Sequence, residues 1–171
     1  ESVQPFLFNL FNDPAIIGLP GPLRWLVARL ISSRRAPVAR EIYANLGGKS
    51  PLLDLTRDQA AALEEALNGG DGDEYRAFIA MRYWHPMTLE AAERVRDWNP
   101  DQVVLLPLYP QFSTTTTGSS LGEWRRAARA VRLDVPTRAV CCYPRNGGFV
   151  AAQADLIRAA LNAAGTGARV L

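Results

Sequence analysis

The segment spanning residues 103–124 constrains the fold of this chain more than any other. It begins with a short apolar run, residues 103–106, which is typical of a strand buried on both faces. A polar loop with four consecutive threonines follows, and Ser119 and Ser120 can then cap a helix that continues through Trp124. In α/β proteins, ligands often bind in the loop between a buried strand and the next helix. The segment therefore predicts an α/β fold with a ligand site at this loop.

The rest of the second half alternates in the same way. Residues 75–83 and 137–142 have the apolar pattern of strands, and residues 168–171 resemble the start of another. Helical patterns cover residues 88–98, the stretch from the threonine loop to about residue 131, and residues 149–164. Strands that alternate with helices imply a parallel, doubly wound sheet with right-handed crossovers. We therefore expect an α/β fold with helices on both faces of a parallel sheet.

The first 70 residues are predicted to be helical. One helix is expected to end at Asp13, before Pro14, and a second to cover residues 23–31. Pro37 suits the first position of a third helix that ends near residue 46. A capping box at residues 56–59, with Thr56 as the cap, predicts a fourth helix that ends at Leu67.

Two features of this helical part allow both a structural and a functional interpretation. Residues 6–19 carry more large apolar side chains than one amphipathic face needs, so they form either ordinary core or a lip that covers a flat hydrophobic ligand. Arg34 and Arg35 lie where the second helix is predicted to end. They would complement the helix dipole there, or they could bind a carboxylate through the guanidinium fork.

Composition excludes several classes of protein. The chain has 171 residues, enough for one domain with a sizeable core, and its net charge of +2 indicates neither a nucleic acid partner nor a charged membrane surface. No apolar run is long enough for a transmembrane helix, and the first residues lack the pattern of a secretory signal. Cys141 and Cys142 are predicted to be buried thiols, which suits a reducing cytoplasm. With one histidine, they cannot supply the roughly four ligands of a tetrahedral metal site.

Five segments together resemble ferrochelatases, the lyases that insert ferrous iron into a porphyrin in the last steps of haem synthesis. They are FLFNLFNDPAIIGLP (residues 6–20), RRAP (34–37), IYANLGGKSPLL (42–53), MRYWHP (81–86) and LPLYPQFSTTTTGSS (106–120). The resemblance runs from end to end with similar spacings, and the tyrosine–threonine run and the glycine-rich run are specific to this family.

The resemblance implies a half-length chain with a Rossmann-like fold. Family members are roughly twice as long and hold the porphyrin between two similar halves, so residues 1–171 resemble the N-terminal half-domain. Residues 1–70 would form the helical lip and helices, and residues 71–171 would form the alternating strands and helices. The first strand of the family would be missing before Glu1. The catalytic histidine would follow Leu171, so no catalytic residue is expected here and the chain alone is expected to be inactive.

The resemblance also assigns candidate porphyrin contacts. Phe6, Leu10 and Ile16 match the hydrophobic lip, which favours the functional interpretation of that segment. The other matched residues fall into three groups: Arg35, Tyr43 and Ser50 near the propionates, Arg82 and Tyr83 in the inner pocket facing the iron side, and Tyr109 and Ser120 in the pocket floor. Val38 replaces a lysine of some members, which puts one propionate contact in doubt. His85 is expected to be structural, with a backbone partner.

Cofactors and partners follow from the same resemblance. No bound cofactor and no metal ligand are expected in this half. Fe²⁺ would be a substrate of the intact enzyme, and Thr114 replaces a cysteine that binds an iron–sulfur cluster in some members, so no cluster is expected from this half. Expected partners are a porphyrin and the C-terminal half of the same chain, with no nucleic acid. The apolar lip also suggests peripheral contact with a membrane, and an uncovered sheet edge suggests self-association. The expected location is the cytoplasm.

Three other functions are alternatives. A related tetrapyrrole chelatase for cobalt or nickel would show a histidine-rich metal site, whereas this chain has one histidine. A tetrapyrrole-binding module without enzymatic activity would bind porphyrin and leave it unmetallated. A nucleotide-binding α/β domain would carry a glycine-rich loop after its first strand, and no GxGxxG motif is present.

Overall fold

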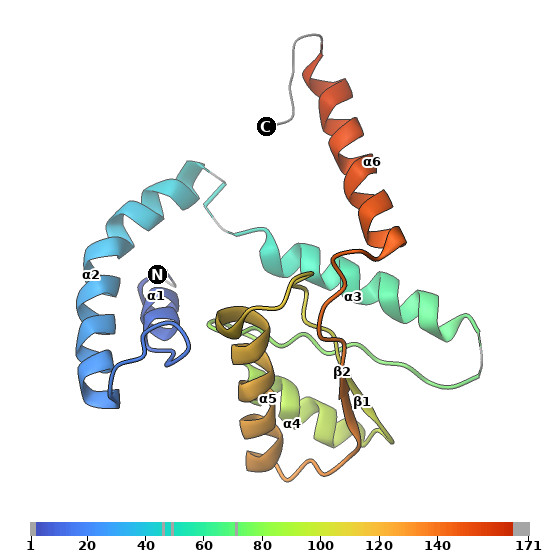
Figure 1. Cartoon of the computed structure of the whole chain (residues 1–171), viewed down its shortest axis with the longest axis horizontal. Helices are drawn as coiled ribbons and strands as arrows, with labels where there is room; N and C mark the ends of the chain where they lie inside the picture. Colours follow the sequence, from blue (N-terminus) through green and yellow to red (C-terminus); the bar gives the residue numbers. More distant parts are fainter. Residues whose placement is uncertain (1–2, 46, 49, 71, 166–171) are drawn as a thin grey trace.

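Over the residues that the structure describes, the chain has a mixed α/β structure with six α-helices and a small parallel sheet, consistent with a Rossmann-like chelatase fold (Figure 1). The computed structural model describes residues 3–45, 47–48, 50–70 and 72–165. Within that part, the elements are α1 (Val3–Phe11), α2 (Gly21–Asn45), α3 (Leu52–Asn68), α4 (Thr88–Trp98), β1 (Val103–Leu105), a π-helical turn η1 (Thr114–Gly118), α5 (Ser119–Ala130), β2 (Thr137–Ala139) and α6 (Gly147–Ala164). The strand predicted at residues 168–171 lies outside the described residues.

The sheet consists of β1 and β2, which pair in parallel with Val103 opposite Thr137 and Leu105 opposite Ala139. Together with α5 they form one β–α–β unit, which confirms the predicted parallel connection. Both strands are shorter than predicted, and β1 is not buried on both faces. Val103 is 8% exposed but Val104 is 59% exposed, because only one face of β1 packs against helices.

The core lies between that face and the helices α4 and α5. Its buried members are Ala92, Val95, Val103, Trp124, Ala127 and Val131, and Phe78, Leu105 and Leu133 pack against them. Trp124 is the largest side chain of this cluster and is 7% exposed. Its burial removes much apolar surface from water, so this one residue contributes strongly to the stability of the β–α–β unit.

The strand predicted at residues 75–83 does not form. Its backbone groups pair with side chains of α3 instead of a neighbouring strand. The Asn68 amide both donates to the Tyr75 carbonyl, at 2.9 Å, and accepts from the Tyr75 N–H, at 2.8 Å, while Glu64 accepts from the Ala77 N–H. An isolated parallel bridge joins Met81 to Met87. Arg82 and Tyr83 lie in a bend, and no described strand pairs with the segment, so its apolar pattern alone does not make it a strand.

The N-terminal helices also differ from the prediction. α2 is one helix of 25 residues with Pro37 inside it, where two shorter helices were expected. Pro37 is exposed, so water can solvate the carbonyl that its ring frees, and α2 bends toward its C-terminal end (Figure 1). Arg34 and Arg35 therefore lie mid-helix, and the helix-dipole explanation for them is wrong. α3 begins at Leu52, so Thr56 is not a cap; its hydroxyl donates to the Leu52 carbonyl at 2.7 Å.

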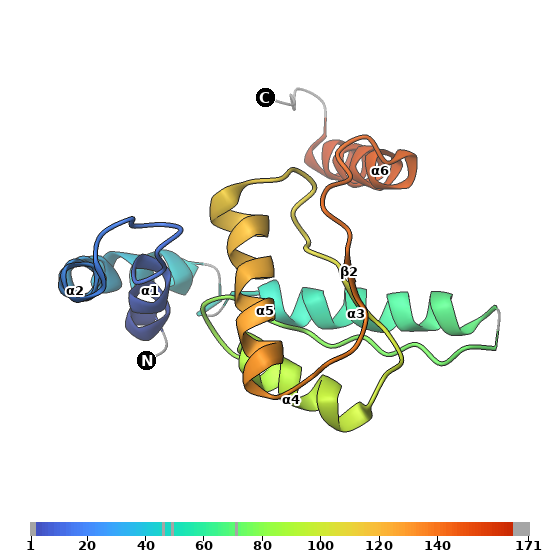
Figure 2. The same cartoon turned by 60° about the horizontal axis from the view of Figure 1, so that its bottom comes forward.

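α1 and α2 lie side by side in both views, away from α6 (Figures 1 and 2). The fully buried residues of α2 are small and four positions apart, namely Ala28, Ser32 and Ala36. Phe8 of α1 and Trp25 of α2 stack edge to face with their ring centroids 6.2 Å apart. Small residues allow the two helix backbones to approach closely, so the pair forms a unit that contacts the Tyr83 region through α1 and the residues after it.

The C-terminal helix α6 extends away from the β–α–β unit (Figures 1 and 2). Its apolar residues Val150, Leu156 and Ile157 are 51%, 66% and 44% exposed. Cys141 and Cys142 precede it and are both exposed, so the prediction of buried thiols is wrong. β2 ends at Ala139, two residues before the thiols, and they therefore lie outside the sheet. Among the described residues, no helix is long and apolar enough to span a membrane.

We expect Trp124→Ala to lower the free energy of unfolding by about 3–5 kcal/mol, because it leaves a cavity in the core. Trp25→Ala is the matched control: Trp25 is 46% exposed, so its loss should cost about 1 kcal/mol. Urea unfolding of both variants measures the difference. Equal losses would show that the core does not centre on Trp124.

Candidate functional site

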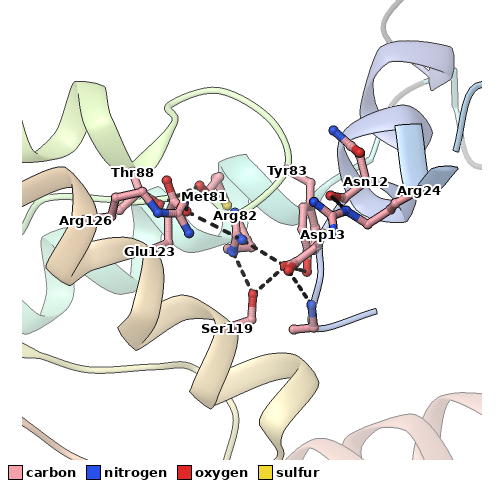
Figure 3. Close-up of polar contacts among 11 residues, drawn as sticks. Asn12, Asp13, Arg24, Met81, Arg82, Tyr83, Thr88, Ser119, Glu123 and Arg126 are labelled. Carbon is pink, nitrogen blue, oxygen red and sulfur yellow. Dashed lines mark hydrogen bonds and ion pairs between the residues drawn. The ribbon is translucent and has the colours of Figure 1, made fainter. Parts of the chain in front are cut away.

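Three distant parts of the chain meet at the carboxylate of Asp13, just after α1 (Figure 3). Its Oδ2 accepts hydrogen bonds from Arg82 Nη2 at 2.8 Å, from the Tyr83 hydroxyl at 2.9 Å and from the Ser119 hydroxyl at 2.6 Å. Its Oδ1 accepts from the Ala15 N–H at 2.8 Å. The Asp13 side chain is only 3% exposed, so these four donors replace the water that a carboxylate normally binds.

Tyr83 is held at three points by the N-terminal residues. The Asn9 side-chain amide donates to the Tyr83 carbonyl at 3.1 Å, and the Phe6 ring meets the Tyr83 ring edge to face with centroids 6.5 Å apart. The third contact is the hydroxyl bond to Asp13. α1 and the turn after it therefore fix the backbone, the ring and the hydroxyl of a residue 70 positions later in the chain.

Arg82 lies between two carboxylates, and its charge is already paired within the protein. Besides its bond to Asp13, its Nε donates to the Ser119 hydroxyl at 2.8 Å, and its Nη2 lies 3.6 Å from Glu123. Glu123 in turn lies 2.6 Å from Arg126. The guanidinium also lies over the Tyr83 ring, 5.0 Å from its centroid. Because its charge is matched within the protein, Arg82 is better suited to shaping a pocket wall than to capturing a free carboxylate.

The threonine run brings Ser119 to this cluster. Ser113, in an extended conformation, accepts a hydrogen bond from the Thr115 N–H and so caps the helical stretch earlier than predicted. The threonines are therefore helical, and Thr117 is fully buried. One turn of π-helix then leads directly into α5, whose first residue is Ser119. The prediction that Ser119 and Ser120 cap the helix is wrong, because the cap lies six residues before Ser119 and the Ser119 hydroxyl bonds to Asp13.

The network shifts the acidity of two of its members. Burial alone would raise the pKa of Asp13, but hydrogen bonds from Ser119, the Ala15 N–H and Tyr83, together with the Arg82 charge, outweigh it and hold that pKa below its ordinary value of 3.8. Burial is the largest cause that raises the pKa of Tyr83 to about 12, and the adjacent Asp13 carboxylate adds to it. At neutral pH, Asp13 is therefore a carboxylate and Tyr83 is a hydrogen-bond donor.

The structure brings together only part of the set of residues predicted from sequence. Arg82 and Tyr83 lie together, and Phe6 contacts Tyr83. Leu10 and Ile16 flank the network, since the Leu10 carbonyl accepts from the Asp13 N–H and the Asp13 carbonyl accepts from the Ile16 N–H. Ser120 is half-buried and directly follows Ser119 in α5.

The remaining predicted residues lie elsewhere. Arg35 and Tyr43 are on α2, the first exposed and the second half-buried, and Ser50 is exposed in the turn before α3. Tyr109 is 38% exposed in the loop after β1. Within the described ranges, none of these four has a hydrogen bond or ring contact with the Asp13 network. The structure leaves their proposed roles untested.

Sequence reasoning missed the centre of the site. The sequence pattern predicts Asp13 only as a residue that ends a helix, and Ser119 only as a cap. One available signal was an acidic residue inside an otherwise apolar segment. A carboxylate surrounded by large apolar side chains requires partners from other elements. The sequence contains an adjacent arginine and tyrosine, Arg82 and Tyr83, that can supply them.

No group of three or more potential metal ligands occurs in the described part of the chain. His85 is 60% exposed, and its Nδ1 lies 2.6 Å from Glu90 Oε1, so its partner is a carboxylate on α4 where a backbone group was expected. The Trp84 ring meets the imidazole edge to face, with centroids 5.2 Å apart. His85 thus serves to anchor the start of α4 at the surface.

We expect Asp13→Asn to lower the free energy of unfolding by about 3–5 kcal/mol at neutral pH, because it leaves Arg82 buried beside a neutral group. Because the folded pKa of Asp13 lies below the unfolded value of 3.8, its contribution is complete above that value and is lost as pH falls through the folded pKa. Unfolding measured against pH should therefore show the gap between wild type and variant closing below about pH 4.

Asp155→Asn is the matched control, since Asp155 is 74% exposed in an ion pair within one helix. Its effect should stay within about 0.5 kcal/mol. A gap between wild type and Asp13→Asn that is constant down to low pH would contradict the ionised network.

Comparison with known proteins places this site in a family. The family model for ferrochelatase matches residues 1–171. A ferrochelatase from Hyphomonas neptunium is 58% identical over 168 residues, which cover 96% of this chain and 46% of that protein. Ferrochelatases from Phenylobacterium zucineum and Pelagibacter ubique are 54% and 51% identical, over 96% and 88% of this chain and 48% and 44% of their own lengths.

The chain thus spans about half the length of the curated relatives it matches. The match includes the residues that build the Asp13 network and extends along the whole sequence. The chain belongs to the ferrochelatase family.

Proposed function

We propose that these residues form the porphyrin-binding half of an enzyme that inserts ferrous iron into a porphyrin. Membership of the ferrochelatase family carries this proposal. The geometry supports it because an apolar helix, α1, is fastened against the Arg82–Tyr83 pair through Asp13. A flat apolar macrocycle with charged edges needs such a combination of an apolar surface and fixed polar groups.

The apolar contact would come from the lip, here defined as residues 6–19. Ile16 and Leu19 are each 36% exposed, while Phe6 and Leu10 are half-buried against the network. The loop after β1 adds Leu108 and Phe112, which are 51% and 52% exposed, and Tyr109. Exposed apolar side chains on two separate loops favour binding of a large apolar ligand.

The propionates would bind Arg35, with Tyr43 and Ser50 near the same edge. Arg35 is exposed on α2 and has no ion-pair partner in the described part of the chain, so its guanidinium fork is free for a carboxylate. Ser50 accepts a hydrogen bond from the Leu52 N–H at 3.3 Å, which leaves its hydroxyl proton available for donation. Arg82, by contrast, is neutralised by Asp13 and Glu123 and would shape the inner wall.

Metallation must also remove two pyrrole protons, and the Asp13 network is unsuited to that step. A carboxylate whose pKa is lowered is a weak base at neutral pH, and Tyr83, with its pKa raised to about 12, keeps its proton. His85 is exposed and paired with Glu90. We therefore propose that the base belongs to the remainder of the intact enzyme and that this half binds and orients the porphyrin.

Iron is proposed as a substrate of the intact enzyme, with no cofactor bound by this half. The proposal that this half contributes no iron–sulfur ligand rests on Thr114 alone. Cys141 and Cys142 are exposed, so burial does not withhold them from a metal. Iron and sulfide analysis of the full-length protein, with each cysteine replaced by serine in turn, tests this. A cluster that is lost with either cysteine would contradict the proposal.

The remaining half of the enzyme is the proposed partner, and self-association is proposed for this chain when it is alone. The exposed apolar residues of α6, Val150, Leu156 and Ile157, support both. We expect light scattering to show oligomers of the 171-residue chain at micromolar concentration, and Leu156→Glu to reduce them. A monomer under the same conditions would contradict self-association.

We expect residues 1–171 to bind a porphyrin, seen as a shift of its Soret band, without inserting iron. The full-length protein should do both. Arg35→Ala should weaken binding of a porphyrin with free propionates by about 10- to 100-fold, since one charged hydrogen bond is lost, and should not affect its propionate ester.

Arg158→Ala is the control, because Arg158 is 70% exposed and pairs only with Asp155 among the contacts of the described residues. A full-length protein that binds porphyrin and leaves it unmetallated would overturn the enzymatic proposal in favour of a binding module. Iron insertion by residues 1–171 alone would overturn the assignment of the base to the other half.

A further inference from the structure

Asp13 belongs to the lip, and its side chain also supports the wall, here defined as Arg82, Tyr83 and Ser119. It lies between Leu10 and Ile16 in sequence, and its own backbone bonds to both: its N–H donates to the Leu10 carbonyl at 3.3 Å, and its carbonyl accepts from the Ile16 N–H at 3.0 Å. Its side chain bonds to Arg82, Tyr83 and Ser119, which precede α4 and begin α5. The backbone of this residue therefore shapes the lip, and its side chain fixes the wall.

The hydrogen bonds are arranged so that neither the lip nor the wall can move alone. Arg82 Nε and Nη2 bond to Ser119 and to Asp13, and the Ser119 hydroxyl donates to the same Asp13 oxygen, so the three groups form a closed ring of hydrogen bonds. If the lip moved away, Arg82 would keep Glu123 at 3.6 Å as its nearest carboxylate. A buried guanidinium and a buried carboxylate would then both lose partners, which is unfavourable.

We propose that Asp13 is a positioning residue that couples closure of the lip to the orientation of Arg82 and Tyr83. When the lip is in place, its carboxylate fixes the guanidinium and the phenol; when the lip is displaced, both side chains are released. This proposal rests on the proposed function only for its consequence, namely that a porphyrin held by the lip meets a fixed inner wall. The coupling itself is a property of the protein without ligand.

The first experiment uses the full-length protein without ligand. Hydrogen exchange is measured at the backbone amides of Ile16 and Ile17 and at the Arg82 Nε–H in wild type, Asp13→Asn and the exposed control Asp155→Asn. Both amides donate to the Asp13 carbonyl. In Asp13→Asn, exchange should accelerate at the lip amides and at Arg82 together, by about 10- to 100-fold, the equivalent of one charged hydrogen bond. Acceleration at only one of the two places would overturn the coupling.

The second experiment measures porphyrin affinity, kcat and KM for the same full-length proteins. Asp13→Asn should lower kcat/KM by about 100-fold, the effect of misplacing groups by about 1 Å, and Asp155→Asn should leave it unchanged. Wild-type values for Asp13→Asn in both affinity and turnover would overturn the inference. A wild-type protein that binds no porphyrin would overturn the proposed function and leave the exchange experiment decisive for the coupling.

If circular dichroism shows that Asp13→Asn does not fold, Ser119→Ala tests the coupling in its place. It removes one donor from Asp13 and one acceptor from Arg82 while keeping every charge. Accelerated exchange at the Arg82 Nε–H and at the Ile16 amide together would support the coupling. Accelerated exchange at Arg82 alone would contradict it, because the lip would then be independent of the wall.

Discussion

The arrangement of this chain depends on a buried negative charge. The Asp13 carboxylate is almost fully removed from water, and such a group is stable only where donors surround it. Its donors come from the backbone two residues later, from the segment before α4 and from the start of α5. Satisfying one charge thus fixes how the N-terminal helices meet the β–α–β unit, a junction that otherwise relies on Phe6, Asn9 and Tyr83.

The same charge balance determines what the site can do. Arg82 is matched by Asp13 and Glu123, and the Tyr83 hydroxyl donates a hydrogen bond to Asp13, so neither a free cation nor a strong base is present in the trio of Asp13, Arg82 and Tyr83. With Arg126 paired to Glu123, the charges of the network are balanced within the protein. In the proposed function, capture of the propionates would fall to exposed arginines such as Arg35, and proton removal would fall to groups outside the network. This division of roles fits the proposal that these residues bind and orient the porphyrin.

The sequence predicted the elements whose formation depends on local pattern. α4 has the predicted bounds, and α6 begins two residues before its predicted start. The parallel pairing of β1 and β2 follows from the alternation of strands and helices. The failures concern partners from elsewhere. Residues 75–83 have the pattern of a strand but no neighbouring strand among the described residues, and their backbone groups bond to α3. Likewise, Arg82 and Tyr83 were found through family resemblance, whereas Asp13 was missed because its role depends on residues about 70 and 106 positions away.

The most direct test of this account is an NMR titration of the Asp13 carboxyl carbon in the folded protein. The midpoint should lie below 3.8, the ordinary value for aspartate, because three hydrogen bonds and the Arg82 charge stabilise the ionised form more than burial destabilises it. The Arg82 Nε–H resonance should change over the same pH range. A midpoint above 3.8 would mean that burial dominates and that Asp13 does not hold the lip, Arg82 and Tyr83 together.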